Sequence, residues 1–353
     1  RKNYFYQDLP QGYQISQFKD PIVGNGFVEI KSDGQLKKIG IERLHLEQDA
    51  GKSLHDQDPN LTFVDLNRSG IALMEIVSMP DMKSPDEAVE YVKKVRSILR
   101  YLDTCDGNME QGSLRADVNV SVNKPGNDLG TRCEIKNLNS FKYIYSAIIY
   151  EAKRQIKLIE SGENIIQETR LYNIDSGETR SMRSKEDAHD YRYFPDPDLL
   201  PLVLEEDWIE KIKGSIPELP DSKKERFIRE YGLSEYDSSV IVSDKSTSDY
   251  YEKVVQDRNP KLVTTWVTSE LFSVLNKKNI SIDESPVPPN HLGELIDNID
   301  SGKISSRQAK DIFEEMCKKG DTAQNIINEK GLSQISDESE LKKLVETVLS
   351  SNP

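Results

Sequence analysis

The sequence has few cysteines, no long apolar run and no surplus of positive charge, and each absence excludes a class of protein. Its three cysteines, Cys105, Cys133 and Cys317, lie far apart and form no C-x-x-C pair. This spacing supports neither a zinc site nor a disulfide framework, and it favours a reducing compartment. No apolar stretch approaches the roughly 20 residues of a membrane-spanning helix, so no membrane partner is expected. The first 30 residues carry three carboxylates, which is not typical of a signal peptide.

The balance of charge limits the kinds of partner that the chain can bind. Its 353 residues include 47 lysines and arginines against 61 aspartates and glutamates, a net charge of −14. This acidity argues against tight, non-specific nucleic-acid binding, although it allows shape-specific RNA contacts from a local patch. Hydrophobic residues at 36% and charged residues at 31% are typical of a folded protein with a core. From the length we expect two or three domains.

Two strands with a polar face are predicted between Asn108 and Ser140. Polar and apolar side chains alternate in residues 117–122 and again in 132–136, and a period of two puts each set on one face. The polar positions, with two charged residues before them, are Glu110, Arg115, Asp117, Asn119, Ser121, Arg132, Glu134 and Lys136. Both signs of charge on one face suit a site that handles a metal ion and phosphate. A strand face turned toward water is the competing interpretation.

Local signals predict a hairpin and two helices around these strands. Alternating runs flank Asp33–Gly34, a good hairpin turn. One helix is expected after the N-cap Ser84, where Glu87 completes a capping box. A second helix is expected from Ser140 to a stop at Ser161–Gly162. If both apolar stripes pack on one sheet face, the fold is α+β and the charged face is free for a ligand.

The segment DAGKS at residues 49–53 suggests a phosphate-binding loop at first sight. A P-loop requires glycine where this chain has Leu46, and it follows a buried parallel strand that the preceding residues do not predict. We therefore exclude a P-loop. Further along, Glu75 lies inside the apolar run 71–77, where a carboxylate is either at a strand edge or a ligand.

Arginines gather in the segment that follows the second predicted helix. They are Arg170, Arg180, Arg183 and Arg192, and aromatic residues stand at positions 191, 193 and 194. Arginine at this density suits the recognition of phosphate or carboxylate groups. A set of solvated loop charges is the alternative.

Beyond residue 215 the sequence changes to short helical segments with an acidic surplus. Prolines between Pro286 and Pro289 mark a linker. We therefore predict an α+β domain over residues 1–215, an all-α domain over 216–285 and the start of a further helical domain over 286–353.

Several segments in a fixed order carry a resemblance to a known family. They are RKNYFYQDLPQGYQISQ, RLHLEQDAGKS, DLNRSGIALMEIVSMPD, MEQGSLRADVNVSV, EIKNLNSF, QETRLYN and DYRYFPDPDLLPL. With these segments the whole chain resembles the GatB family, the B component of the tRNA-dependent amidotransferase. The resemblance implies an antiparallel-sheet cradle domain, similar in its active-site sheet to glutamine synthetase. It also implies a helical domain and then a tail domain that contacts tRNA.

The resemblance implies a ligase that works in a heterotrimer with an amidase, GatA, and a small third protein, GatC. The amidase releases ammonia from glutamine. GatB uses ATP and Mg²⁺ to phosphorylate the side-chain carboxylate of Glu-tRNA(Gln), and often of Asp-tRNA(Asn). Ammonia then displaces the phosphate to give the amidated tRNA for translation. We expect this reaction in the bacterial cytoplasm, with an organelle matrix as the alternative.

The resemblance also assigns roles to individual residues. Glu47, Glu75 and Glu110 match acidic positions of the family and are the expected metal ligands. Arg115, Arg132 and Lys136 are expected to meet phosphates or the substrate carboxylate, and Asp117 and Glu134 to support the metal or ammonium. Lys2 matches a lysine on the ammonia path. The residues expected to bind cofactor phosphates are Lys52, Arg115, Lys136 and Arg183. The lysines and arginines fit the reaction because phosphoryl transfer needs charge neutralisation, and the carboxylates fit because Mg²⁺ prefers oxygen ligands.

Two departures from the family shape these expectations. Family members begin with a segment containing Glu-x-His that supplies further metal ligands, and this chain starts after it. The tail domain also ends early, so we expect a kinase site that is impaired in this chain alone. Two alternative functions stay open, a non-catalytic tRNA-binding scaffold of the same complex and a stand-alone ligase that uses free ammonia.

Overall fold

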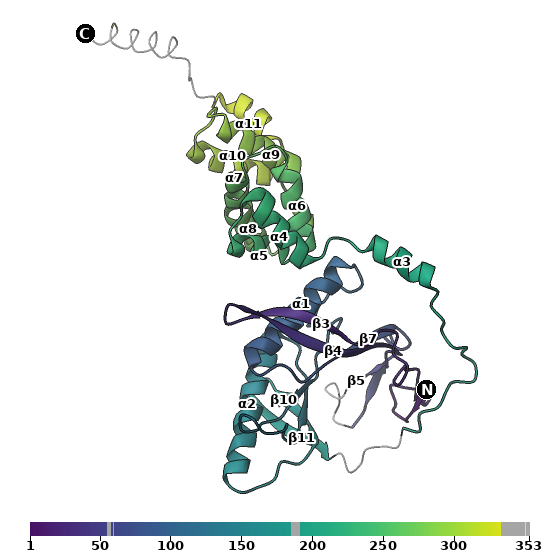
Figure 1. Cartoon of the computed structure of the whole chain (residues 1–353). Coiled ribbons are helices and arrows are strands. Elements are labelled where there is room, and N and C mark those ends of the chain that lie inside the picture. The colour runs from purple at the N-terminus through teal and green to yellow at the C-terminus, as the bar shows by residue number, and fades with distance from the viewer. Residues whose placement is uncertain (55–57, 59, 185–190, 333–349, 351–353) are drawn as a thin grey trace. The chain divides into compact units, whose positions relative to one another are not determined.

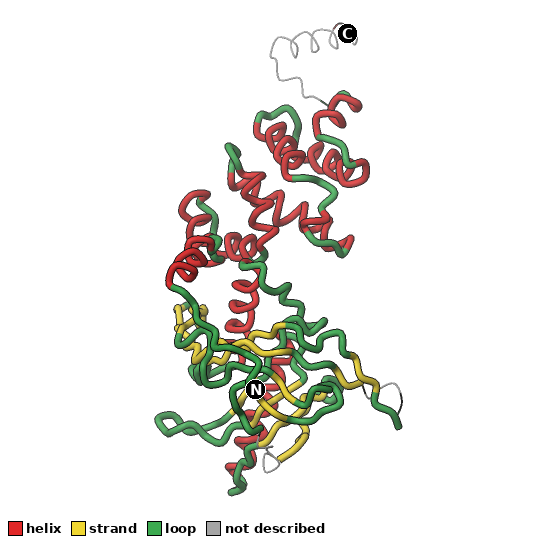
Figure 2. Tube along the Cα trace, turned by 90° about the vertical axis from the view of Figure 1, so that its right-hand side faces the viewer, coloured by secondary structure: helices red, strands yellow, loops and turns green. Residues whose placement is uncertain are grey.

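The computed structural model describes residues 1–54, 58, 60–184, 191–332 and 350. It divides into two units (Figure 1). Unit 1 comprises residues 1–99 and 103–215, and unit 2 comprises residues 100–102 and 216–353. Within the described ranges the strands lie in unit 1, whereas unit 2 consists of helices and loops, as the colours of Figure 2 show. No helix in these ranges combines the length and apolar character needed to cross a membrane.

The first sheet of unit 1 is built on the predicted hairpin. Strands β3 (Gly26–Ser32), β4 (Gln35–Gln48) and β7 (Ala72–Ser78) are antiparallel in the order β3-β4-β7. Asp33 and Gly34 join β3 to β4 with φ values of 49° and 79°. Two residues of positive φ suit the primed two-residue turns of hairpins, so the hairpin prediction is confirmed.

Strand β4 contains a β-bulge that divides it into two halves. Its register against β7 shifts between Ile41 and Arg43, which leaves Glu42 as an extra residue. Before the bulge, Ile39 and Ile41 pack into a core with helix α1 (Pro85–Tyr101). After it, Leu44 and Leu46 hold the apolar positions, so the odd-numbered residues change faces. The residues that share this new face are His45 and Glu47, and Asp49 follows just beyond the end of the strand.

The second sheet has the order β11-β10-β9-β8 and confirms the predicted pair of polar-faced strands. Strands β8 (Val118–Val120) and β9 (Cys133–Lys136) are antiparallel, with Asn119 opposite Glu134. β9 and β10 (Glu168–Asn173) are parallel, and β11 (Glu178–Ser184) pairs with β10. The sheet is therefore mixed, whereas an antiparallel sheet was expected. A parallel pair needs a long crossover, which helix α2 (Phe141–Glu160) supplies between β9 and β10.

Both predicted helices form with the expected caps. The Ser84 hydroxyl accepts a hydrogen bond from the Glu87 amide at 3.1 Å, and the Ser140 hydroxyl accepts from the Tyr143 amide at 3.2 Å. The capping box is altered, since the Glu87 carboxylate accepts from the amide of Lys83 rather than from Ser84. Helices α1 and α2 pack together on the second sheet, and α1 also covers the first.

Residues 108–115 correct one expectation, because they form turns and do not extend the polar-faced strand. Gly112 has a φ of 76°, which favours glycine. The Asn108 carbonyl accepts from the amide of Ser113 at 2.8 Å, and its side chain accepts from Gln111 at 3.0 Å. Glu110 is thereby exposed in a turn.

Two short strand pairs complete the strands of unit 1, and residues near the start of the chain contact the second half of β4. The pairs are β1 (Lys2–Asn3) with β2 (Tyr13–Gln14), and β5 (Lys52–Leu54) with β6 (Phe63–Asp65). Ser16 bridges to Glu47 on β4. The Asn3 amide donates to the carbonyl of Tyr191 at 2.8 Å, which ties the segment after β11 to the start of the chain. Helix α3 (Glu206–Ser215) completes unit 1 and buries no residue.

Unit 2 is a helical bundle around one hydrophobic core. Its elements are α4 (Pro220–Tyr231), α5 (Glu235–Val242), α6 (Lys245–Val255), α7 (Pro260–Thr265), η2 (Trp266–Leu271), α8 (Phe272–Lys278), η3 (Ile282–Glu284), α9 (Pro289–Asp300), α10 (Ser306–Lys319) and α11 (Ala323–Lys330). Buried residues before and after position 285 share that core. Tyr101 is also part of it, and its hydroxyl donates to the Val242 carbonyl at 2.8 Å. The predicted division at residue 285 stays a prediction, and residues 333–349 and 351–353 of its second part lie outside the description.

A buried carboxylate connects α2 to the second sheet. Glu151 is fully buried and accepts hydrogen bonds from Arg154, Gln155 and Thr179 at 2.6–3.0 Å. Arg170 on β10 lies 3.3 Å away. Burial alone would raise the pKa of Glu151, but these hydrogen bonds outweigh burial and hold the pKa below its ordinary value of 4.5.

We predict that Glu151→Gln destabilises unit 1 by about 1.5–3 kcal/mol, because Arg154 and Arg170 lose one of their two carboxylate partners and keep only Glu168. Because the folded pKa is depressed, the stabilisation is present above pH 4.5 and is lost as the pH falls through the lower folded pKa. Urea titrations read by hydrogen exchange of α2 and β10 peptides measure both effects. Glu160→Gln, an exposed change on the same helix, is the control. Equal urea midpoints for the two variants would refute the prediction.

Candidate metal centre

An imidazole and two carboxylates converge where β4 pairs with β7. His45 and Glu75 are direct cross-strand partners, and Glu47 lies two residues further along β4. His45 Nε2 lies 3.1 Å from Glu47 Oε1 and 3.2 Å from Glu75 Oε2. The three ligand atoms lie within 4.8 Å of one another. The fold thus brings together two of the three predicted metal ligands, Glu47 and Glu75, and adds His45.

Neighbouring side chains orient the Glu47 carboxylate. The Ser16 hydroxyl donates to Oε1 at 2.7 Å, and Gln14 Nε2 donates to Oε2 at 3.2 Å. The Gln14 side chain in turn accepts from the Tyr4 hydroxyl at 3.0 Å. Such supporting contacts hold a metal ligand in one orientation and commonly affect metal affinity strongly.

The donor set fits a divalent cation. The His45 residue is 2% exposed, and its Nδ1 is buried without a hydrogen-bond partner among the described residues. Two carboxylates facing one nitrogen leave negative charge that a cation would neutralise. The Glu75 side chain is 50% exposed, which leaves access from solvent. One imidazole with two carboxylates suits Mn²⁺ or Zn²⁺ as well as Mg²⁺, which prefers oxygen ligands.

His45 was not among the metal ligands expected from the sequence. It lies two residues before Glu47, so both side chains point to the same face of a strand. The sequence signal for His45 is the interrupted alternation of apolar residues at Ile39, Ile41 and Leu44. This interruption marks the bulge, and after the bulge the odd-numbered residues of β4 turn toward the site.

Two tyrosines beside the centre are held in the protonated form. Burial, and then the Glu47 carboxylate, raise the pKa of Tyr4 to about 12. The same two causes, in the same order, raise the pKa of Tyr193. Both phenols therefore stay neutral near pH 7. Phe18 stacks on Tyr193 with 4.4 Å between ring centroids, adding an aromatic edge to this region.

The predicted catalytic residues on the second sheet form a separate cluster. Lys136 Nζ lies 2.6 Å from Asp117 and 3.5 Å from Glu134. Burial lowers the pKa of Lys136, but the Asp117 carboxylate outweighs burial and the net pKa is raised. Neither carboxylate belongs to the group at His45. Arg132 is exposed just before β9.

Other predicted residues surround β4 at different places. The Arg115 guanidinium donates to Asp49 at 2.9 Å. Lys2 Nζ lies 5.2 Å and 4.4 Å from the ring centroids of Tyr4 and Tyr191, a cation–π arrangement.

Three predicted ligands lie outside these groups. Glu110 does not belong to the group at His45. Lys52 is exposed at the start of β5, and a strand rather than a helix follows it, unlike the chain after a P-loop. Arg183 lies in β11, and its side chain is outside the described part.

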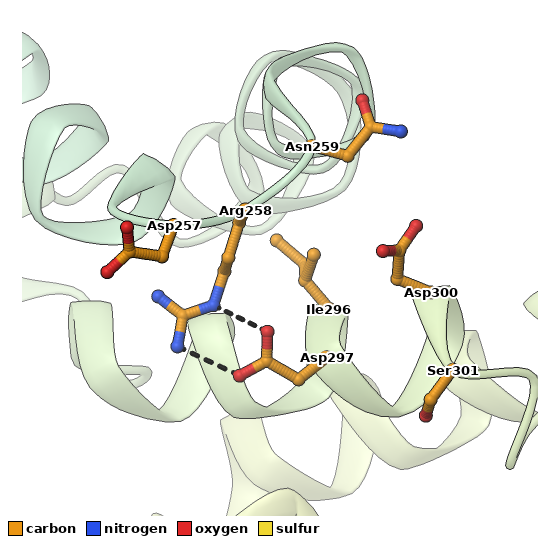
Figure 3. Close-up of a pocket in the computed structure, with 7 residues that line it drawn as sticks. All are labelled: Asp257, Arg258, Asn259, Ile296, Asp297, Asp300 and Ser301. Atoms are coloured by element: carbon orange, nitrogen blue, oxygen red, sulfur yellow. Dashed lines mark hydrogen bonds and ion pairs between the residues drawn. The ribbon is translucent and has the colours of Figure 1, made fainter.

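Unit 2 has a small open pocket of about 190 Å³ (Figure 3). Arg258 Nε and Nη2 donate to the two carboxylate oxygens of Asp297 at 2.8 and 2.9 Å. This pair neutralises the pocket's arginine, so we assign no ligand there. The lining residues are Asp257, Arg258, Asn259, Ile296, Asp297, Asp300 and Ser301.

The fold and the candidate site define a mixed α/β protein with a candidate divalent-metal centre on an antiparallel sheet and an attached helical unit. Comparison with known proteins narrows this class. The family described as GatB/GatE catalytic domain matches residues 1–210, and the GatB domain matches residues 249–353. The chain belongs to the GatB family, which confirms the resemblance drawn from the sequence.

Curated relatives carry the name of the B component of aspartyl/glutamyl-tRNA(Asn/Gln) amidotransferase. That of Granulibacter bethesdensis is 58% identical over 354 residues, which span all of this chain and 73% of the relative. The relative from Sinorhizobium fredii is 57% identical, and the alignment spans all of this chain and 72% of the relative. The relative from Rickettsia felis is also 57% identical, and the alignment spans all of this chain and 73% of the relative. These relatives are subunits of a tRNA-dependent amidotransferase, which is a ligase.

We predict that His45→Ala and Glu47→Gln each weaken Mn²⁺ binding at least about tenfold, because each removes a ligand from a small donor set. Electron paramagnetic resonance of free Mn²⁺ in titrations of the chain measures this. Glu29→Gln removes a carboxylate of the same sheet that is paired with Lys38, and it leaves affinity unchanged. If all three variants bind Mn²⁺ like the unaltered chain, the metal centre lies elsewhere.

Proposed function

We propose that the chain is the kinase and transamidase component of a tRNA-dependent amidotransferase. It transfers the γ-phosphoryl group of ATP to the side-chain carboxylate of Glu-tRNA(Gln), of Asp-tRNA(Asn) or of both, releasing ADP. Ammonia then attacks the acyl phosphate, phosphate leaves, and the tRNA carries the amide. The convergence of His45, Glu47 and Glu75 on one sheet face carries this proposal. The relatives' name supplies the substrate class.

In this mechanism His45, Glu47 and Glu75 hold Mg²⁺, which when bound neutralises charge on the ATP phosphates. Ser16 and Gln14 keep Glu47 in its ligating orientation through their hydrogen bonds. Glu110 remains a proposed ligand from the neighbouring turn.

Positive side chains neutralise the remaining charge in the proposed reaction. Arg115, Arg132 and Lys136 contact phosphate or substrate carboxylate oxygens, because developing charge on these oxygens needs fixed donors. Asp117 and Glu134 keep Lys136 in position. Lys2, between its two tyrosine rings, lies on the ammonia path. We also propose Lys52 and Arg183 as contacts to the nucleotide.

We propose that the chain acts in a heterotrimer with the amidase GatA and the small protein GatC. Exposed apolar side chains in residues 199–216 support a protein partner for this segment. Leu200 is 91% exposed, Val203 74% and Trp208 51%. Exposed apolar residues gathered in one segment are typical of a surface that another protein covers.

We further propose that unit 1 is the cradle domain. Unit 2 then contains the helical domain and the start of the tRNA-contacting tail domain. The relatives named above are bacterial, and we place the reaction in the bacterial cytoplasm, where aminoacyl-tRNA is used.

We predict that Glu75→Gln in the assembled complex slows phosphoryl transfer from γ-³²P-labelled ATP to Glu-tRNA by about 100-fold or more, because the metal site loses a carboxylate. Single-turnover assays with labelled ATP measure this rate, and filter binding measures the affinity for Glu-tRNA, which stays unchanged. Glu29→Gln is the matched control in the same sheet. Unchanged transfer in Glu75→Gln would show that the assignment of Glu75 as a metal ligand is wrong.

A further inference from the structure

Asp49 is a buried carboxylate at the end of the same β4 face that carries the metal centre. It is 6% exposed. Its amide donates to the Ile71 carbonyl at 2.8 Å, and its carbonyl accepts from Gly70 at 2.9 Å, so both backbone groups are bound to the segment that leads into β7. His45 and Glu47 share one face of β4, and Asp49 follows directly after the strand ends at Gln48.

Two arginines that are distant in sequence share this carboxylate. Arg68 Nε and Nη2 both lie 2.9 Å from Asp49 Oδ2, and Arg115 Nη2 lies 2.9 Å from Oδ1. Among the described residues neither guanidinium has another carboxylate partner. One negative charge between two positive charges leaves a net positive charge beside the metal centre.

Both guanidiniums keep unused donors that solvent can reach. The side chains of Arg68 and Arg115 are 36% and 56% exposed, and a guanidinium has five N–H donors in a planar fork. Arg68 Nη1 faces Gly112, where an added Cβ would lie 3.5 Å from it. Arg68 therefore reaches the turn that carries Glu110.

We propose that Asp49 is a positioning residue that holds Arg68 and Arg115 together as a two-arginine site for an anionic oxygen group. This inference rests on the proposed function, which supplies two such groups, the terminal phosphoryl group of the nucleotide and the carboxylate of the tRNA-bound amino acid. Guanidinium forks match both chemically. Arg68 then contacts the bound group directly, and Asp49 acts through the two arginines.

The test uses the assembled amidotransferase complex with Arg68→Ala, Arg68→Lys and Asp49→Asn. Calorimetry measures the equilibrium binding of MgADP, and then the binding of inorganic phosphate with MgADP present. Steady-state kinetics give KM and kcat for ATP and for Glu-tRNA. We expect Arg68→Ala to weaken one of these ligands by about 10- to 100-fold, the range for a hydrogen bond to a charged group. Arg68→Lys restores part of the loss, and Asp49→Asn gives an intermediate loss.

The ligand that responds identifies the group. Weaker phosphate binding with a higher KM for ATP assigns the site to the phosphoryl group, whereas a higher KM for Glu-tRNA alone assigns it to the substrate carboxylate. Arg229→Ala, which removes an exposed arginine paired with Glu230 in unit 2, is the control for nucleotide binding.

A purely structural ion pair gives a different result. In that case the three variants lower the melting temperature but leave every dissociation constant and KM unchanged, and the inference is wrong. If Arg68→Ala does not fold, the dissociation constants and KM values of Arg68→Lys and Asp49→Asn test the inference instead. If Glu75→Gln abolishes phosphoryl transfer while these variants bind normally, the proposed function stands and only this inference falls.

Discussion

One extra residue in β4 is the constraint on which the candidate site depends. Glu42 interrupts the pairing with β7, and the alternation of side chains changes phase there. Without it, His45 and Glu47 would project to the face that holds Ile39, inside the core under α1. Burying an unpaired carboxylate there would cost several kcal/mol. The bulge lets one strand supply both a packed core and a polar site.

The remainder of unit 1 keeps this strand in place. Helix α1 packs against both sheets, and Met82 and Val92 contribute to both clusters. Helix α2 is the crossover between two parallel strands, and its buried Glu151 binds the second sheet. Packed strands therefore carry the candidate metal centre, while Tyr193 from the segment after β11 lies near its carboxylates. A site built on packed strands holds its geometry more closely than one built on loops.

Much of the local structure follows from the sequence, because its signals are local. The D-G turn at Asp33–Gly34 and the cap at Ser140 each act over a few residues. Contacts between residues that are distant in the sequence could not be predicted from such local signals. The parallel contact between β9 and β10 and the binding of Asp49 by Arg68 join distant segments. The turn at Gly112, where the backbone is left-handed, separates Glu110 from the polar strand face with which the sequence pattern had grouped it. Glu47 and Glu75 are ligands proposed from the resemblance, whereas the position of His45 beside them depends on the bulge.

The hydrogen bond between Asn3 and Tyr191 sets a condition on how the protein is made. It joins residues separated by almost the whole length of unit 1, and such contacts form late because closing a long loop costs entropy. Tyr193, near the candidate metal centre, reaches its position only after the ribosome has synthesised the chain beyond β11, the last strand of the second sheet in chain order. Until then the carboxylates of β4 and β7 lack this aromatic neighbour.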